Sequence, residues 1–263
     1  MNWIEALILG ILQGLTEFLP VSSSGHLEIG KHLLNIEAAD SMTFTVVVHG
    51  ATVLSTIIVF RKDIWTLIKG VFAFSWNEET KYVAKIVLSM LPVLLIGLFL
   101  KDYVETLFDG NLLFVGFMLL ITAILLAFTY YAKQKDKDIS YRNAFLIGVS
   151  QAIAVIPGIS RSGATIATAL LLGSRKDDAA KFSFLMVIPP IIGANILDLL
   201  DTEATASDIS GMVLSVGFIS AFVTGLLACT LMISLVKKGK LIYFAVYCAV
   251  VALIAIIFNV LTA

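Results

Sequence analysis

The sequence predicts an all-α integral membrane protein built as an inverted repeat, and three observations lead to this fold class. Of the 263 residues, 59% are hydrophobic and 14% are charged, with a mean hydropathy of +0.98, which is too apolar for an ordinary soluble domain. Apolar segments of about 20 residues, the length that crosses a bilayer, recur along the chain. One polar motif occurs twice, because Gly148-Val-Ser-Gln151 follows Gly10-Ile-Leu-Gln13 at an offset of 138 residues.

The first segments are too short to span a membrane alone. Segment 1–19 ends at Pro20, and segment 26–34 is brief and carries charged residues. We therefore expect two half-helices of a re-entrant hairpin that bends at residues 20–25. Non-helical backbone is tolerated at membrane depth only where protein or a water-filled cavity surrounds it. The N-terminal segment lacks a basic n-region, so we expect it to be part of the fold and not a signal peptide.

A second hairpin follows the polar linker 133–142, with half-helices at 143–156 and 164–173 and a bend at 157–163. Three full spans follow each hairpin, at 42–60, 82–100, 111–132, 179–200, 210–236 and 241–262.

The chain is thus one membrane domain of residues 1–263, with repeat one at 1–132 and repeat two at 143–263. Three spans per repeat is an odd number, so the two repeats enter the membrane from opposite faces.

Charges in the connections predict the orientation. One side of the six-span arrangement is basic, with Arg61, Lys62, Lys69, Lys81, Lys85, Lys133, Lys135, Lys137, Arg142, Arg175, Lys176, Lys181, Lys237, Lys238 and Lys240. The other side is mainly acidic, with Glu37, Asp40, Lys101, Asp102, Glu105, Asp109, Asp201, Glu203 and Asp208. By the positive-inside rule the basic side is cytoplasmic, so both termini and the mouth of the first hairpin face outward.

The first hairpin concentrates polar side chains. Gln13 and Glu17 share a helix face, and Gly10 and Gly14 beside them allow another backbone to approach closely. The bend and the next half-helix then supply three hydroxyls and an imidazole, from Ser22, Ser23, Ser24 and His26. Free N–H groups and a partial positive charge at a helix N-terminus bind anions, so we interpret this hairpin as half of an anion site.

The second hairpin supplies the other half, with Ser160, Ser162, Gly163 and Thr165. It adds Arg161, whose planar fork of donors matches phosphate oxygens. If the two bends meet, Glu17, His26 and Arg161 converge and would bind a polyanion.

Structural explanations remain open for several of these residues. Glu17 and Arg161 could form only a buried structural pair, although each charge costs about 2.5–3.5 kcal/mol at the centre of a membrane helix and is seldom kept without a use. Ser22 and Ser24 could be capping residues. His49, alone in the predicted span 42–60, is interpreted as a packing residue.

The motifs resemble those of a known family. Gln13-x-x-x-Glu17 followed by Pro-Val-Ser-Ser-Ser-Gly-His26, and Pro157-Gly-Ile-Ser-Arg161-Ser-Gly-Ala-Thr165, are similar to motifs of the bacterial undecaprenyl-pyrophosphate phosphatases, also called bacitracin-resistance proteins. The similarity runs over the whole chain. It implies a multi-pass enzyme of the bacterial plasma membrane that removes the terminal phosphate of undecaprenyl pyrophosphate, regenerating the carrier lipid of peptidoglycan and other envelope polymers.

The resemblance also implies a divalent cation, Mg²⁺ or Ca²⁺. The family often has Glu at the first motif position, where this chain has Gln13, so Glu17 is expected to be the principal metal ligand.

Residues and resemblance together predict a mechanism. The pyrophosphate enters from the outer face, while the prenyl tail stays in the bilayer. Arg161 binds its charge, and Ser23 is the expected nucleophile with His26 or Glu17 as its base. The remaining polar groups of the bends are expected to bind phosphate oxygens: Ser22, Ser24, Ser160, Ser162, Gly163 and Thr165.

A transporter or flippase of an anionic lipid would use the same midplane site. Transport needs no nucleophile beside a carboxylate and an imidazole, and this combination favours the hydrolase. The sequence contains no nucleic-acid-binding module, and it leaves open whether the chain forms a homo-oligomer.

Overall fold

A computed structural model describes residues 1–34, 36, 38–100, 103–104, 106–107, 111–132, 137–200 and 209–262, of which 38–42, 198–200 and 262 are described by their backbone alone. Throughout these ranges the chain is helical, without strands. Its elements are α1 (Trp3–Phe18), α2 (Ser23–Leu34), α3 (Ala38–Val59), α4 (Arg61–Phe72), α5 (Glu78–Phe99), α7 (Leu112–Phe128), η1 (Thr129–Tyr131), α8 (Tyr141–Ile153), α9 (Arg161–Leu171), α10 (Lys176–Met186), α11 (Ile188–Leu200), α12 (Gly211–Lys237) and α13 (Ile242–Thr262).

Within the described ranges, five helical segments are long and apolar enough to cross a membrane, and a sixth is counted if the bent pair α3 and α4 forms one span. This confirms an integral, multi-pass membrane protein. The predicted span 179–200 corresponds to one of these segments, Lys176–Leu197, which is interrupted at Val187 between α10 and α11. Pro189 and Pro190 lie in the first turn of α11. Because proline has no backbone N–H, neither residue donates a helical hydrogen bond to the preceding turn, at the end of α10.

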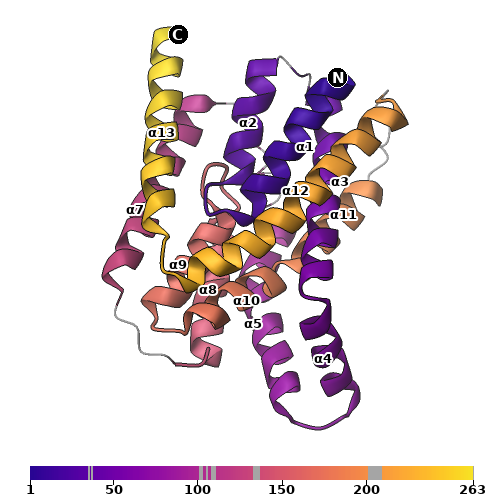
Figure 1. Cartoon of the computed structure of the whole chain (residues 1–263), viewed down its shortest axis with the longest axis vertical. Coiled ribbons are helices and arrows are strands. Elements are labelled where there is room, and N and C mark those ends of the chain that lie inside the picture. The colour runs from indigo at the N-terminus through magenta and orange to yellow at the C-terminus, as the bar shows by residue number, and fades with distance from the viewer. Residues whose placement is uncertain are drawn as a thin grey trace.

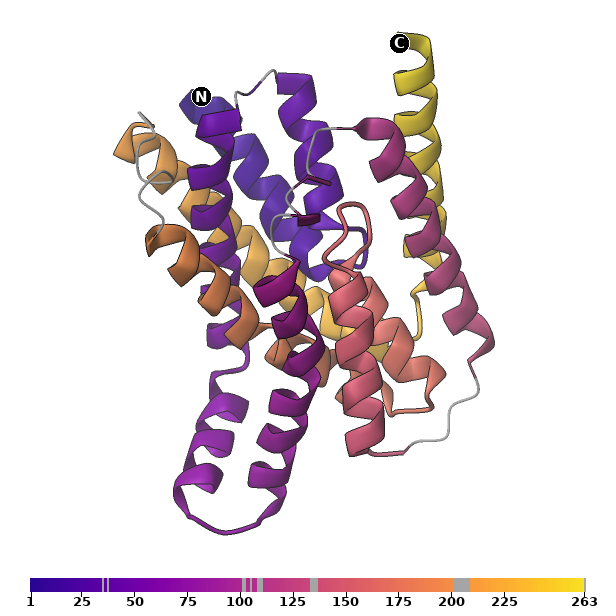
Figure 2. The same ribbon diagram turned by 180° about the vertical axis from the view of Figure 1, so that it is seen from behind.

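Helix α4 was not predicted. From the sequence, its charged residues, among them Arg61 and Lys69, are expected in a connection. The structure instead turns the chain by 76° after α3 and forms α4, which lies beside α5 (Figure 2). Asn77 caps α5 by accepting a hydrogen bond from the Thr80 N–H at 2.8 Å, so α5 begins four residues before the predicted span.

The two predicted bends are shorter than expected, because capping side chains start the second helix of each hairpin early. Ser22 adopts a positive φ of 68°, and its hydroxyl accepts a hydrogen bond from the Gly25 N–H at 3.2 Å. Ser160 accepts from the Gly163 N–H at 3.0 Å in the same way. Helices α2 and α9 therefore begin at Ser23 and Arg161, inside the predicted bends 20–25 and 157–163.

The two hairpins open toward opposite ends of the molecule, and their bends meet in the middle. Helices α1 and α2 run from the end that holds both termini, whereas α8 and α9 run from the other end (Figures 1 and 2). The hydroxyl of Ser162 donates to the Leu19 carbonyl at 3.1 Å and joins one bend to the other. Thr122 of α7 also stabilises the second bend, because its hydroxyl donates a hydrogen bond to the Gly158 carbonyl at 3.2 Å.

The two termini lie at one end of the molecule, and the helices leading to the basic connections run away from it (Figure 1). This agrees with the prediction that the basic connections lie on the side of the membrane opposite the two termini. Part of the charge pattern lies outside the described side chains: Glu37, Asp40, Lys101, Asp102, Glu105, Asp109, Lys133, Lys135, Asp201, Glu203 and Asp208.

Small residues bring α1 and α8 into close contact with neighbouring helices. A Cβ atom on Gly10 would collide with the Ser220 hydroxyl and lie 2.6 Å from the Gly217 carbonyl oxygen of α12. A Cβ atom on Gly148, the equivalent residue of the second repeat, would collide with the Ser89 carbonyl of α5. The predicted close approach of another backbone to Gly10 is therefore confirmed, and the partner is α12.

We expect Gly10→Ala to destabilise the protein by about 1–3 kcal/mol, because the added methyl group meets backbone atoms that cannot rotate away. Thermal unfolding in detergent measures the effect. Gly97→Ala in α5 is the control, since a Cβ atom there has no atom within 4 Å. Equal melting temperatures for the two variants would contradict the close contact between α1 and α12.

Candidate active site

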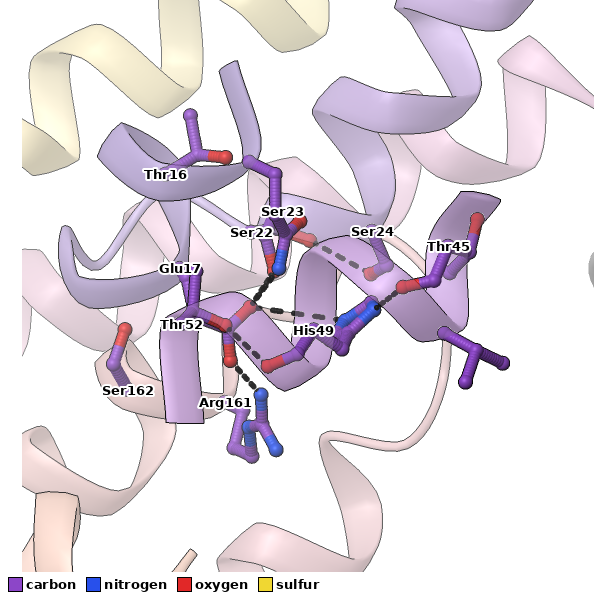
Figure 3. Close-up of polar contacts among 12 residues, drawn as sticks. Thr16, Glu17, Ser22, Ser23, Ser24, Thr45, His49, Thr52, Arg161 and Ser162 are labelled. Atoms are coloured by element: carbon purple, nitrogen blue, oxygen red, sulfur yellow. Dashed lines mark hydrogen bonds and ion pairs between the residues drawn. The ribbon is translucent and has the colours of Figure 1, made fainter. Parts of the chain in front are cut away.

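Glu17, near the end of α1, is the centre of a buried polar cluster. Its carboxylate accepts hydrogen bonds at Oε2 from the Ser23 hydroxyl at 2.6 Å and from Gln13 Nε2 at 3.0 Å. Arg161 Nη2 forms an ion pair with the other oxygen, Oε1. Figure 3 shows Ser23, Arg161 and His49 around this carboxylate. The cluster therefore joins a hydroxyl, a carboxylate and a guanidinium from both repeats.

The meeting of the two bends explains this geometry. Ser23 is the first residue of α2 and Arg161 is the first residue of α9, so both helix N-termini point their partial positive charge at the cluster. Glu17 lies only six residues before Ser23, and the reversal of the chain between α1 and α2 brings the two side chains together. The predicted convergence of Glu17 and Arg161 is thus observed.

His26 does not join this cluster, in contrast to the sequence-based expectation. Its Nδ1 lies 2.9 Å from the Ser22 carbonyl oxygen, and its Nε2 lies 2.9 Å from the Tyr247 hydroxyl of α13. The imidazole also stacks on the Tyr247 ring. Both ring nitrogens are therefore engaged by the bend and by α13, and it is Glu17 that holds the Ser23 hydroxyl.

His49 of α3 takes the place expected for His26. Its Nε2 lies 3.9 Å from Glu17 Oε2, and its Nδ1 lies 2.8 Å from the Thr45 carbonyl oxygen. A carbonyl oxygen can only accept, so Nδ1 carries a proton and Nε2 is the nitrogen that faces Glu17. His49, interpreted above as a packing residue, lies beside Glu17 and lines the cavity next to it. The available signal was a lone imidazole within an apolar segment.

Most of the other hydroxyls hold the bends together. Ser22 and Ser160 are caps, and Ser162 joins the two bends, as described above. Thr165 donates to the Arg161 carbonyl of its own helix at 2.9 Å. Ser24, in contrast, lines the cavity beside the cluster. Ser162 and Thr165 also line a smaller pocket that contains Glu17 and Arg161. The expectation that these hydroxyls bind phosphate oxygens is therefore supported by position for Ser24, Ser162 and Thr165, whereas Ser22 and Ser160 are caps.

A cavity of about 360 Å³ opens beside the cluster. Its polar wall consists of Ser23, Ser24, Thr45, His49, Gln151, Arg161 and Asn195, and its other lining residues are apolar. A cavity with a few convergent polar groups in an apolar wall is typical of a binding site for a small ligand or for the head of a larger one.

The donor set is compatible with a hard divalent cation. The described residues contain no group of three or more His, Cys, Asp or Glu side chains that could bind a metal. However, Mg²⁺ is commonly held by one or two carboxylates, water and the phosphates of a substrate. Glu17 supplies one carboxylate, and the buried Gln13 Oε1 is an oxygen donor without a hydrogen-bond partner in the described part of the chain.

Comparison with known proteins decides the family. The model of the family described as bacitracin resistance protein BacA matches residues 6–254. The chain belongs to the BacA family. This BacA-family chain is 58% identical over 260 residues to the undecaprenyl-diphosphatase of Christiangramia forsetii, with 98% of each chain covered.

The identity to the undecaprenyl-diphosphatase of Bacteroides fragilis is 57% over 261 residues, with 98% of each chain covered. An archaeal relative of the same name, from Methanococcus vannielii, is 40% identical over 264 residues that cover 97% of this chain and 100% of the relative. The similarity of this BacA-family chain to its relatives thus extends over the two hairpins and the spans.

Proposed function

We propose that this protein removes the terminal phosphate of undecaprenyl pyrophosphate and releases undecaprenyl phosphate, the carrier lipid for envelope polymers. The observation that carries the proposal is the hydrogen bond from the Ser23 hydroxyl to Glu17, beside Arg161 in a cavity. The names of the full-length relatives support the choice of substrate.

The first step transfers the terminal phosphate to Ser23. Glu17 accepts the hydroxyl proton while the Ser23 oxygen attacks the terminal phosphorus. The bond between that phosphorus and the bridging oxygen breaks, and undecaprenyl phosphate leaves with the bridging oxygen. Arg161 donates hydrogen bonds to the phosphate oxygens with the N–H groups that Glu17 does not use.

The second step is hydrolysis of the phosphoserine. Water attacks the phosphorus, the Ser23 oxygen leaves, and Glu17 returns a proton to it. Both hydrogens of the water leave on the released phosphate, as dihydrogen phosphate, and Glu17 is again a carboxylate. The N-termini of α2 and α9 favour the negative charge throughout. In this scheme Glu17 is the base, and His26 supports the bend through Ser22 and Tyr247.

A divalent cation fits this scheme. Glu17 and the Gln13 side-chain oxygen would hold it together with the pyrophosphate. When bound, Mg²⁺ or Ca²⁺ would neutralise part of the phosphate charge.

We also propose that the two hairpins are re-entrant and that the halves form an inverted repeat in the bacterial plasma membrane. The support is that the first helix of each half packs against a helix of the other half. Helix α1 contacts α12 of the second half, and its equivalent α8 contacts α5, which is the equivalent of α12. The cavity then opens to the outer face, toward which the first hairpin opens.

This orientation predicts a labelling pattern. Single cysteines at positions 105 and 204 should react with an impermeant reagent from outside, and those at 136 and 238 should not. Positions 105, 136 and 204 lie outside the described residues, so positions 111 and 76 provide a second pair for the outer and inner faces. The native Cys229 and Cys248 are buried and should stay unlabelled. Reaction of both sets from one side would contradict the orientation.

Phosphate release from a prenyl pyrophosphate by purified protein in detergent tests the function directly. We expect release of one phosphate per lipid and loss of activity with a chelator that is reversed by added Mg²⁺ or Ca²⁺. Lipid binding without phosphate release would contradict the hydrolase and favour the transport alternative.

A further inference from the structure

Gln151, near the end of α8, is a buried amide without a hydrogen-bond partner. Its side chain is 2% exposed, and neither Oε1 nor Nε2 is paired within the described ranges. Buried polar groups are almost always hydrogen-bonded, so an amide with both atoms unpaired needs an explanation. The side chain lines the cavity that also contains Ser23 and Arg161, so a ligand in this cavity would lie beside it.

The repeat explains why this amide is free. Gln13 is its equivalent in the first repeat, and it donates to Glu17, four residues later on the same helix face. The residue four positions after Gln151 is Val155, which offers no acceptor. The second repeat therefore keeps the amide but lacks the carboxylate that pairs with it in the first repeat.

We infer that Gln151 binds the second phosphate of the substrate, the one that remains on the lipid. This inference rests on the proposed function. Ser23 and Arg161 are joined through Glu17 and would meet the terminal phosphate. Gln151 forms no hydrogen bond with that cluster although it lines the same cavity, so it would meet a different part of the ligand. Its two N–H donors match phosphate oxygens, which only accept.

A binding experiment without turnover tests the assignment. In a Ser23→Ala background, we compare Gln151→Leu with the parent for binding of farnesyl pyrophosphate and farnesyl monophosphate. The loss of a hydrogen bond to a charged oxygen should weaken pyrophosphate binding by about tenfold. Monophosphate binding should change by less than about twofold, because that ligand can be held by Arg161 alone.

A matched control is Ser150→Ala in the same turn of α8, where the hydroxyl donates to the Ile147 carbonyl at 2.7 Å. It should bind both ligands as the parent does. Without ligand, Gln151→Leu should melt no lower than the parent, because it removes an unpaired buried amide. Gln151→Met, which keeps the length of the side chain, is a second variant if the Leu protein folds poorly.

Equal weakening for both ligands would overturn the inference, as would no weakening for either. A lower melting temperature for both the Leu and the Met variants, with ligand binding unchanged, would assign Gln151 to the fold and overturn it as well. Failure of the proposed function gives a different result, since protein with Ser23 intact would then bind farnesyl pyrophosphate and release no phosphate.

Discussion

Ser23→Ala should lower turnover by about 10⁴-fold or more, the range seen when a nucleophile that acts with its base is removed. The reason is the short hydrogen bond between the Ser23 hydroxyl and Glu17, which would put the nucleophile beside its base. Binding of the pyrophosphate lipid should stay within a few-fold, because Arg161 and the helix N-termini remain. Phosphate release measures turnover, and equilibrium binding measures affinity.

Ser24→Ala is the matched control, in the same turn of α2. The Ser24 hydroxyl lies 3.3 Å from that of Ser22 and forms no hydrogen bond with Glu17 in the described structure. We expect a far smaller loss of activity. A Ser23→Ala enzyme with substantial activity would contradict attack by Ser23 and leave water as the attacking group.

Arg161→Lys should lower turnover by about 10²- to 10³-fold, the range for losing one donor to developing charge. Lysine keeps the positive charge that pairs with Glu17 but cannot bind Glu17 and phosphate oxygens at once in a planar fork. The protein should still insert and purify normally, since the buried carboxylate keeps an opposite charge. Phosphate release and yield after purification measure the two effects.

Arg175→Lys is the control for this substitution. Arg175 lies just before α10 and pairs with Asp178 and Asp138 away from the cluster. Its replacement should leave turnover unchanged. If Arg161→Lys kept full activity, Arg161 would only balance the charge of Glu17 and would not be needed to bind phosphate. If that variant failed to accumulate, a structural role for Arg161 would be favoured.

The hairpins and spans could be predicted because their signals are local. Segment length, proline positions and the offset between Gln13 and Gln151 all lie in the sequence. Helix α4 was missed because its charges are typical of a loop, whereas packing beside α5 stabilises it as a helix. The span 179–200 was predicted as one segment, and only its interruption at Val187 was not, because mean hydropathy does not record a local loss of helical hydrogen bonds.

The contact between Glu17 and Arg161 could be predicted, because two opposed hairpins whose bends meet bring the polar residues beside the bends together. The presence of His49 beside Glu17, where His26 was expected, could not be predicted. It depends on how α3 packs against α1 and on the Tyr247 hydroxyl, which comes from a helix 221 residues away in sequence. The roles of Ser160 and Ser162 could not be predicted either, since a serine at a helix N-terminus can equally bond to the protein backbone or bind a ligand.

The most direct test of the mechanism is to quench the enzyme during turnover of a prenyl pyrophosphate that is labelled in its terminal phosphate. Mass spectrometry of the digested protein then locates any phosphorylated residue. We predict label on Ser23 in the active enzyme and no label in Ser23→Ala. Label on another residue, or rapid turnover with no labelled residue, would contradict it.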